Sequence, residues 1–271
     1  MSTRNRAARL ARGRFSPREL RYWVGLQAVV FWGLILVCWI IYPTENRYSI
    51  MTHTFSFLGS FEAKHNPQGW WLFSAAMVFW GSSQAPVALY IGHRLSVVSR
   101  WGARVAAALL LLACVGTVFV GLFPDARNIL AGEWRSTDIH EKAAILVAVG
   151  YLLGIPWCGA LLLRDFVRAR RQALPERHLA HGPLVWPLMF WFAVVGVAAR
   201  FLITWERIYA DLRREARETG IQIGSSWAEA LNTRYSFPMW ENILIYSMYI
   251  FLVWFALGLS REPGPKPPNT G

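Results

Sequence analysis

The chain has 271 residues, of which 55% are hydrophobic and 15 are tryptophan, and its mean hydropathy is +0.29. Such a composition is too apolar for a soluble protein of this length and indicates a membrane protein. The net charge of +12 is compatible with nucleic-acid binding, but the cations fall in short blocks between apolar segments. We therefore expect no nucleic-acid partner.

Six segments are long and apolar enough to cross a bilayer, which takes about 20 residues for roughly 30 Å of hydrocarbon. The predicted spans are 22–42, 70–92, 104–123, 139–163, 184–205 and 238–259. The first span follows a basic flank, as a signal peptide would, but it is long and lacks a convincing small-residue cleavage site before Pro43. The sequence predicts an all-α, polytopic six-helix transmembrane bundle that forms one domain over 22–260.

Basic residues predict the topology, because Lys and Arg accumulate on the cytoplasmic side of membrane proteins. Here they concentrate in the N-terminal arm, in the second and fourth connections and in the tail. Both termini are therefore predicted to be cytoplasmic (N-in/C-in). The remaining predicted parts are a basic arm at 1–21, outer connections at 43–69, 124–138 and 206–237, and a disordered, proline-rich tail at 261–271. Helical spacing in the third outer connection favours a solvated amphipathic lid.

Two outer connections contain ordered patterns. Polar and aromatic residues alternate from Tyr48 to Gly59, which suggests a short interfacial or re-entrant helix with His53 and Ser56 on one face. In the second connection, Ser136-Thr137-Asp138 followed by Glu141 resembles a helix N-cap with a capping box. His140 and Glu141 would then open the fourth span at membrane level.

Ionisable groups beside the hydrocarbon are costly and usually mark a functional site. In this chain such residues, together with one serine, converge at similar depth near the outer ends of the spans: His53, Ser56, Asp125, His140, Glu141, Arg200 and Glu241. One interpretation is a zinc site with His53, His140 and Glu241 as ligands and a fourth position left for water. Asp125 or Asp138 would then act as general base or as a partner of a ligand. The competing interpretation is a hydrogen-bonded network that stabilises helix ends.

A second set of candidates concerns substrate. The Arg200 guanidinium could hold a lipid phosphate, or it could extend to water at the interface. We add Trp240 and Asn242, beside Glu241 at the start of the sixth span, to the predicted substrate-binding residues. Ser56 is a candidate nucleophile if His53 or His140 accepts its proton, and otherwise a structural hydroxyl.

Three short motifs carry a family resemblance: Ser56-x-Leu58-Gly59, Phe123-Pro124-Asp125 and His140. They resemble uncharacterised bacterial six-span proteins, which in turn look like the eukaryotic FRAG and DRAM type membrane proteins of GPI-lipid remodelling and autophagy. A more distant similarity is to the alkaline ceramidase and adiponectin-receptor superfamily, whose zinc is held by three His with an accompanying Ser and Asp. His53, Ser56, Asp125 and His140 read onto that pattern, but the sixth span offers Glu241 in place of His and one span is missing.

The resemblance and the residues together favour a lipid-handling protein with a polar pocket at the outer leaflet, in a bacterial inner membrane. It could be a hydrolase or transferase that acts on a lipid headgroup or acyl chain. The alternative is a non-catalytic lipid-binding scaffold or a subunit of another membrane protein. Expected partners are membrane lipids, a membrane protein or a second copy of the chain, and the expected cofactor, if the site is catalytic, is zinc.

Overall fold

The computed structural model describes residues 3–126, 128–131, 134–171, 179, 181–219 and 233–261. Within these residues the helices are α1 (Thr3–Ala11), α2 (Pro17–Ile40), α3 (Trp70–Leu95), α4 (Arg100–Leu122), α5 (Ser136–Arg171), α6 (His181–Thr219) and α8 (Phe237–Ser260). Two short 3-10 helices, η1 (Thr44–Asn46) and η2 (Phe55–Gly59), and a small hairpin of β1 (Ile129–Ala131) and β2 (Trp134–Arg135) complete the fold. All of the long helices from α2 to α8 are apolar enough to cross a membrane, which confirms the six predicted spans.

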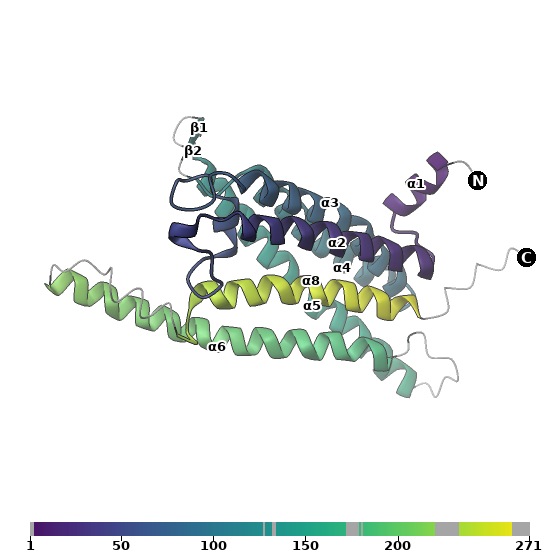
Figure 1. Ribbon diagram of the computed structural model, residues 1–271. Coiled ribbons are helices and arrows are strands. Elements are labelled where there is room, and N and C mark those ends of the chain that lie inside the picture. Colours follow the sequence, from purple (N-terminus) through teal and green to yellow (C-terminus); the bar gives the residue numbers. More distant parts are fainter. Residues whose placement is uncertain are drawn as a thin grey trace, which may run out of the picture.

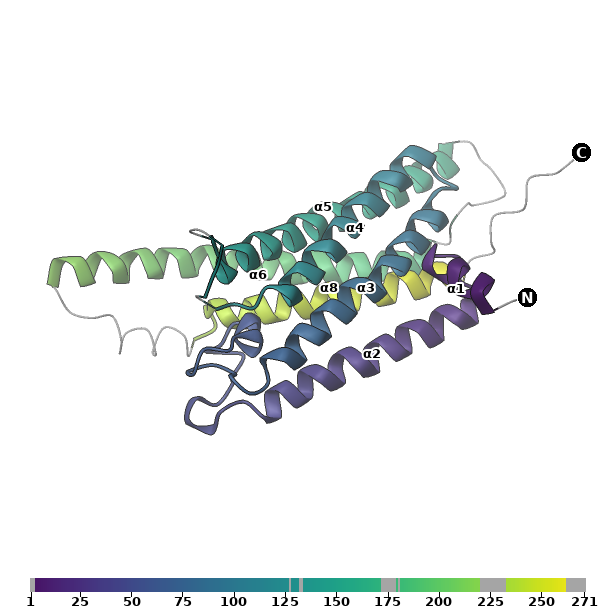
Figure 2. The ribbon, with the colours of Figure 1, turned by 90° about the horizontal axis from the view of Figure 1, so that it is seen from above.

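The long helices form a bundle in which they run roughly side by side (Figures 1 and 2). In chain order, α2, α3, α4 and α5 pack each against the next, α8 lies against α2 and α3, and α6 packs on α8. The beginning of α2 and the end of α8 share one end of the bundle, which we call the termini end. The opposite end carries residues 43–69 and the hairpin, and we call it the cap end.

Part of the predicted basic arm is folded. Ser16 caps α2 and forms a capping box with Glu19, and Pro17 occupies the first turn. The Arg9 guanidinium donates to the Glu19 carboxylate, which ties α1 to the start of α2. Gly13 makes the turn between the two helices with φ of 70°, in the left-handed region that glycine adopts without strain.

Glycines allow α4 and α5 to approach closely. A Cβ atom added at Gly150 of α5 would lie 2.6 Å from the backbone nitrogen of Ala113 in α4. One added at Gly116 of α4 would lie 2.9 Å from the Ala143 carbonyl oxygen in α5. Small residues at such positions let backbones pack where lipid provides no hydrophobic driving force between helices. This packing fixes the start of α5 beside the end of α4.

The first part of the predicted third outer connection is helical and continuous with the fifth span. The segment from Glu206 to Thr219 continues α6 as one helix of 39 residues, about 58 Å long, and it extends past the cap end of the bundle (Figure 1). Uninterrupted helical spacing of charged residues explains why no break occurs at Glu206. The rest of the predicted lid, 220–232, and the predicted tail from 262 onward lie outside the described residues.

Candidate functional site

The cap segment, residues 43–69, is not the single short helix that its pattern suggested. Its helical parts are η1 and η2, which residues 47–54 separate, and Thr54, directly before η2, is extended with ψ of 156°. The break places His53 before η2 and Ser56 within it, so the two side chains do not share one helical face. A 3-10 helix has three residues per turn, which also removes the four-residue spacing on which the prediction depended.

Buried polar side chains fasten the cap segment to α8. Asn242 is fully buried, donates to the backbone carbonyls of His53 at 3.1 Å and Pro238 at 2.8 Å, and accepts from the Tyr48 hydroxyl at 3.0 Å. All of its hydrogen-bonding capacity toward the bundle is therefore occupied by the protein. Asn242, predicted to bind substrate, instead holds the cap in place.

Asp125 links the cap segment to α5. One carboxylate oxygen, Oδ2, accepts from the Ser56 hydroxyl at 2.9 Å, and the other, Oδ1, accepts from the Thr137 hydroxyl at 2.8 Å. The Thr54 hydroxyl lies 3.0 Å from Ser56 Oγ and completes the cluster. The sequence pointed to Ser56 and Asp125 but missed Thr137. The Ser-Thr-Asp run at a helix start, which we interpreted only as a cap, was the available signal.

The first turn of α5 orients His140. Asp138 Oδ2 accepts from the Arg135 backbone at 2.9 Å and so caps the helix start, one position earlier than predicted. Nδ1 of His140 lies 2.8 Å from the carbonyl oxygen of Phe123. Because a carbonyl can only accept, Nδ1 carries the hydrogen of the neutral ring, and Nε2 is left as an acceptor. Within the described residues nothing bonds to Nε2.

A cavity of about 290 Å³ lies beneath η2, between α3, α4, α5 and α8. Three of its lining residues are polar or ionisable: Ser56, His140 and Glu241. The others are apolar: Phe55, Phe73, Met77, Trp80, Val120, Ala144, Ile145, Val147, Ala148, Leu244, Ile245 and Met248. Ile145, one of the lining residues, has 63% of its surface exposed, so the cavity wall on α5 is continuous with the outer surface of the bundle.

Glu241 has an unusual environment for a carboxyl group. Its Oε2 atom is buried and has no hydrogen-bond partner among the described residues. The carboxyl group lies near the backbone N–H of Phe55 and within electrostatic reach of Asp125, and no cation of the described chain pairs with it. A buried polar atom without a partner costs free energy, about 1–3 kcal/mol. A ligand that donates a hydrogen bond in the cavity would remove that cost.

The structure separates His53 from the other two predicted metal ligands. Nε2 of its ring bonds to Asn46 Oδ1 at 3.2 Å and Nδ1 to the Thr52 hydroxyl at 2.8 Å, so both nitrogens are occupied. His53 is also not part of the cavity lining. No group of three or more His, Cys, Asp or Glu side chains in the described residues could hold a metal ion. The three predicted zinc donors therefore do not form one metal site among the described residues.

Arg200 lies on the face of α6 that is turned away from the bundle. The buried stripe of α6 contains Trp191, Ala198 and Trp205, seven residues apart, and faces the bundle. Two residues beyond Ala198, a helix has turned by about 200°, and the Arg200 side chain is exposed. No ion pair involves it within the described chain. The exposed position is compatible with a guanidinium that reaches water at the interface, which stays a prediction.

Trp240 also differs from its predicted substrate-binding role. Its ring stacks on Phe201 of α6 at 4.8 Å between centroids, and its indole nitrogen donates to the Arg234 carbonyl at 2.7 Å. These contacts join the start of α8 to α6 outside the cavity lining. The cavity lining includes a different tryptophan, Trp80, which the sequence did not single out and whose indole nitrogen is buried without a partner among the described residues.

The buried histidines of the cap segment predict a pH dependence. Burial lowers the pKa of His53, and burial together with Lys64 lowers the pKa of His65, which stacks on Phe57. The unfolded chain takes up protons below about pH 6.5, whereas the folded cap resists them. The contribution of these two histidines to the free energy of unfolding is therefore fully present above about pH 6.5. It is lost as the pH falls from there through the lowered pKa values of the folded protein. Thermal unfolding between pH 7.5 and 5 should show this loss, and His65→Gln should reduce it. If the His65→Gln variant lost as much stability on acidification as the wild-type protein, His65 would not be a source of the pH dependence.

The six apolar helices indicate a multi-pass membrane protein, and a cavity with apolar walls and three polar or ionisable side chains lies at its cap end. In comparisons with known proteins, no family model, no curated protein and no solved structure matches the chain. The resemblance to the FRAG and DRAM type proteins thus stays a prediction, as does the more distant one. Functional inference depends on the site itself.

Proposed function

We propose that this protein binds a membrane lipid whose hydrocarbon chain occupies the cavity and whose polar group meets Ser56, His140 and Glu241. The observation that carries the proposal is the unpartnered carboxyl oxygen of Glu241 at the wall of an otherwise apolar cavity. Binding sites for small amphiphiles combine apolar walls with a few placed polar groups in this way. The volume of about 290 Å³ is near the lower limit of such sites and suits one chain better than a whole lipid.

The polar groups also limit the headgroup. His140 Nε2 accepts a hydrogen bond, and the buried Glu241 oxygen needs a donor or a positive charge beside it. A phosphate alone supplies neither, and no exposed or buried arginine lines this cavity. The site therefore favours a lipid with a hydroxyl or amino group close to its chain.

Filling the cavity tests the proposal. Ala148→Phe places a large ring among the lining residues, and the lipid that copurifies with the protein should fall at least fivefold, since overpacking costs about 1–3 kcal/mol. Ala199→Phe is the matched control, because Ala199 is exposed on α6. Mass spectrometry of extracted lipid gives the amounts. Equal lipid retention in the two variants would show that the cavity is not the binding site.

A second candidate function is hydrolysis or transfer on the bound lipid. It is favoured because an imidazole acceptor, a carboxyl group and a hydroxyl face one cavity, as general acid–base catalysis requires. Ser56 donates to Asp125, and no imidazole accepts its proton within the described residues. His140 is thus a candidate base for water or a lipid hydroxyl. Release of fatty acid or headgroup by the purified protein, abolished by His140→Gln, would establish this activity.

We also propose that the cap end faces away from the cytoplasm, in a bacterial inner membrane, on the distribution of basic residues. The three native cysteines are buried, so a single new cysteine can report topology. In intact cells, a membrane-impermeant maleimide should label Glu45→Cys in the cap segment, where Glu45 is exposed. Arg170→Cys at the termini end should react only after permeabilisation. The opposite pattern would reverse the orientation.

A further inference from the structure

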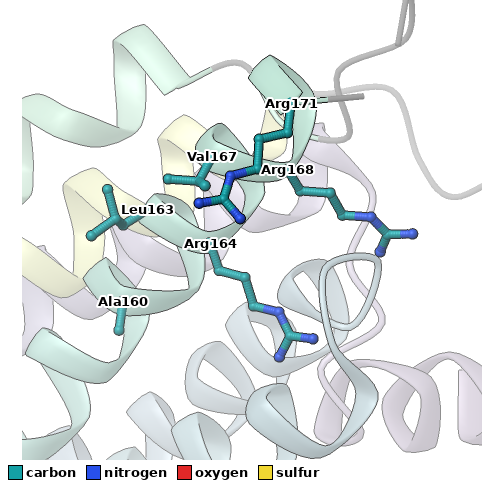
Figure 3. Close-up of a pocket in the computed structure, with 6 residues that line it drawn as sticks. All are labelled: Ala160, Leu163, Arg164, Val167, Arg168 and Arg171. Atoms are coloured by element: carbon teal, nitrogen blue, oxygen red, sulfur yellow. The ribbon is translucent and has the colours of Figure 1, made fainter. Parts of the chain in front are cut away.

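We propose that the termini end binds an anionic phospholipid on one face of α5, at a site separate from the cavity. The site is a groove of about 610 Å³. Its lining residues are Ala160, Leu163, Arg164, Val167, Arg168 and Arg171. In Figure 3, Arg164 and Arg168 extend to the right of this stretch of helix, whereas Leu163 and Val167 lie on its left, with the Arg171 side chain beside Val167.

The length of α5 places this groove at headgroup depth. The helix has 36 residues, about 54 Å, and therefore exceeds the roughly 30 Å hydrocarbon layer. Its last charged residue before the apolar run is the exposed Lys142. About 20 residues of helix cross the layer from there, which brings Leu163 to the far boundary. Arg164 is then the first residue in the headgroup region.

The side chains of the groove match the two parts of a phospholipid. Leu163 has 63% and Val167 has 38% of its surface exposed, which leaves apolar area for acyl chains. Arg164, Arg168 and Arg171 follow at spacings of four and three residues, so they lie on one helical face. Guanidinium groups bind phosphate oxygens bidentately. A phosphate is therefore the group expected beyond the apolar part of the groove.

Charge complementarity supports an anionic lipid as the occupant. In the described part of the chain, no carboxylate forms an ion pair with Arg164 or Arg171, and the adjacent Asp165 is buried away from the groove. A second groove at this end, of about 360 Å³, contains Arg100 and Arg104 from the start of α4. Basic recesses between spans on the cytoplasmic side are typical of sites for anionic headgroups.

The experiment compares two charge-matched variants of the full chain in neutral detergent. Arg164→Gln/Arg171→Gln removes two cations from the groove. Arg170→Gln/Arg261→Gln removes two from the same end of the bundle; Arg170 lies instead over the Phe166 ring, at 5.9 Å. Phosphatidylglycerol and phosphatidylcholine are titrated separately, and bound lipid is counted by native mass spectrometry. Thermal unfolding of each variant checks that it is folded.

The groove variant should lose phosphatidylglycerol affinity by about 30-fold, because each basic residue contributes about fivefold, and the control variant by less than threefold. Wild-type protein should prefer phosphatidylglycerol to phosphatidylcholine, and Ala148→Phe should keep that preference, which separates this site from the cavity. Equal losses of phosphatidylglycerol affinity in the two double variants would overturn the proposal, because they would show that the lipid responds to the total positive charge of this end and not to the groove. Displacement of phosphatidylglycerol by millimolar inorganic phosphate, or by an acidic peptide, would overturn it in favour of a free anion or a protein partner.

Discussion

Glu241→Leu should raise the stability of the protein and lower its lipid binding at the same time. Leucine removes a carboxyl oxygen that is buried without a partner among the described residues, so we expect the free energy of unfolding to rise by about 1–3 kcal/mol. The same change deletes the group that meets the lipid headgroup, and copurifying lipid should fall about tenfold. Opposite signs for stability and binding are expected where a site is built at the expense of the fold.

The measurement is thermal unfolding after exhaustive delipidation, paired with lipid quantification before it. Glu206→Leu is the control, because it removes a carboxylate from the exposed surface of α6 and should change neither quantity by much. If Glu241 were instead paired, its replacement would leave a buried charge and cost about 3–5 kcal/mol. A marked fall in stability would therefore contradict the unpartnered carboxyl oxygen, Oε2 of Glu241, on which the proposed function depends.

The second large effect concerns the contact between α4 and α5. Gly150→Leu should destabilise the bundle by more than about 3 kcal/mol, since the new Cβ would meet the Ala113 backbone nitrogen at 2.6 Å and the Leu109 carbonyl oxygen at 2.8 Å. Backbone atoms cannot move aside as a flexible side chain can. Separation of the two helices would also disturb His140 and Asp125, which lie at the cap end of this contact.

Gly33→Leu is the matched control, because no atom lies within 4 Å of a Cβ added at Gly33 of α2. It should be neutral or slightly stabilising, since glycine is about 1 kcal/mol less favourable than alanine within a helix. Thermal unfolding in detergent and the yield of monodisperse protein report both variants. Similar stability for Gly150→Leu and Gly33→Leu would show that the close approach of α4 and α5 is wrong.

The six spans were predictable because a single physical requirement determines them: about 20 apolar residues for each crossing. The sequence showed helical spacing beyond Glu206 but did not join it to the fifth span, since hydropathy marks where apolar character ends and not where helical hydrogen bonding ends. It likewise missed the fold of the N-terminal arm, which depends on the contact between Arg9 and Glu19.

For the site, the sequence showed at which depth along each span a residue lies. It did not show which way the side chain points around the helix axis. Ser56, His140 and Glu241 were singled out by depth and do line one cavity. Arg200 was at the right depth but on the lipid-facing side of α6, and His53 was turned away by the break at Thr54. The apolar lining could not be predicted, because Trp80 or Met248 look like any other residue of a span until neighbouring helices are placed.

Because the exposed Ile145 lines the cavity, the concentration that governs binding of a ligand is its concentration in the bilayer and not its concentration in the buffer. A compound that enters beside this residue arrives from the bilayer, so occupancy follows its mole fraction among the lipids. Partitioning then multiplies apparent affinity: a sparingly water-soluble amphiphile, enriched in the bilayer, can fill the cavity although its intrinsic affinity is weak. Dissociation constants for this protein should accordingly be compared per mole of lipid, because values per litre of buffer will change with the amount of membrane in the assay.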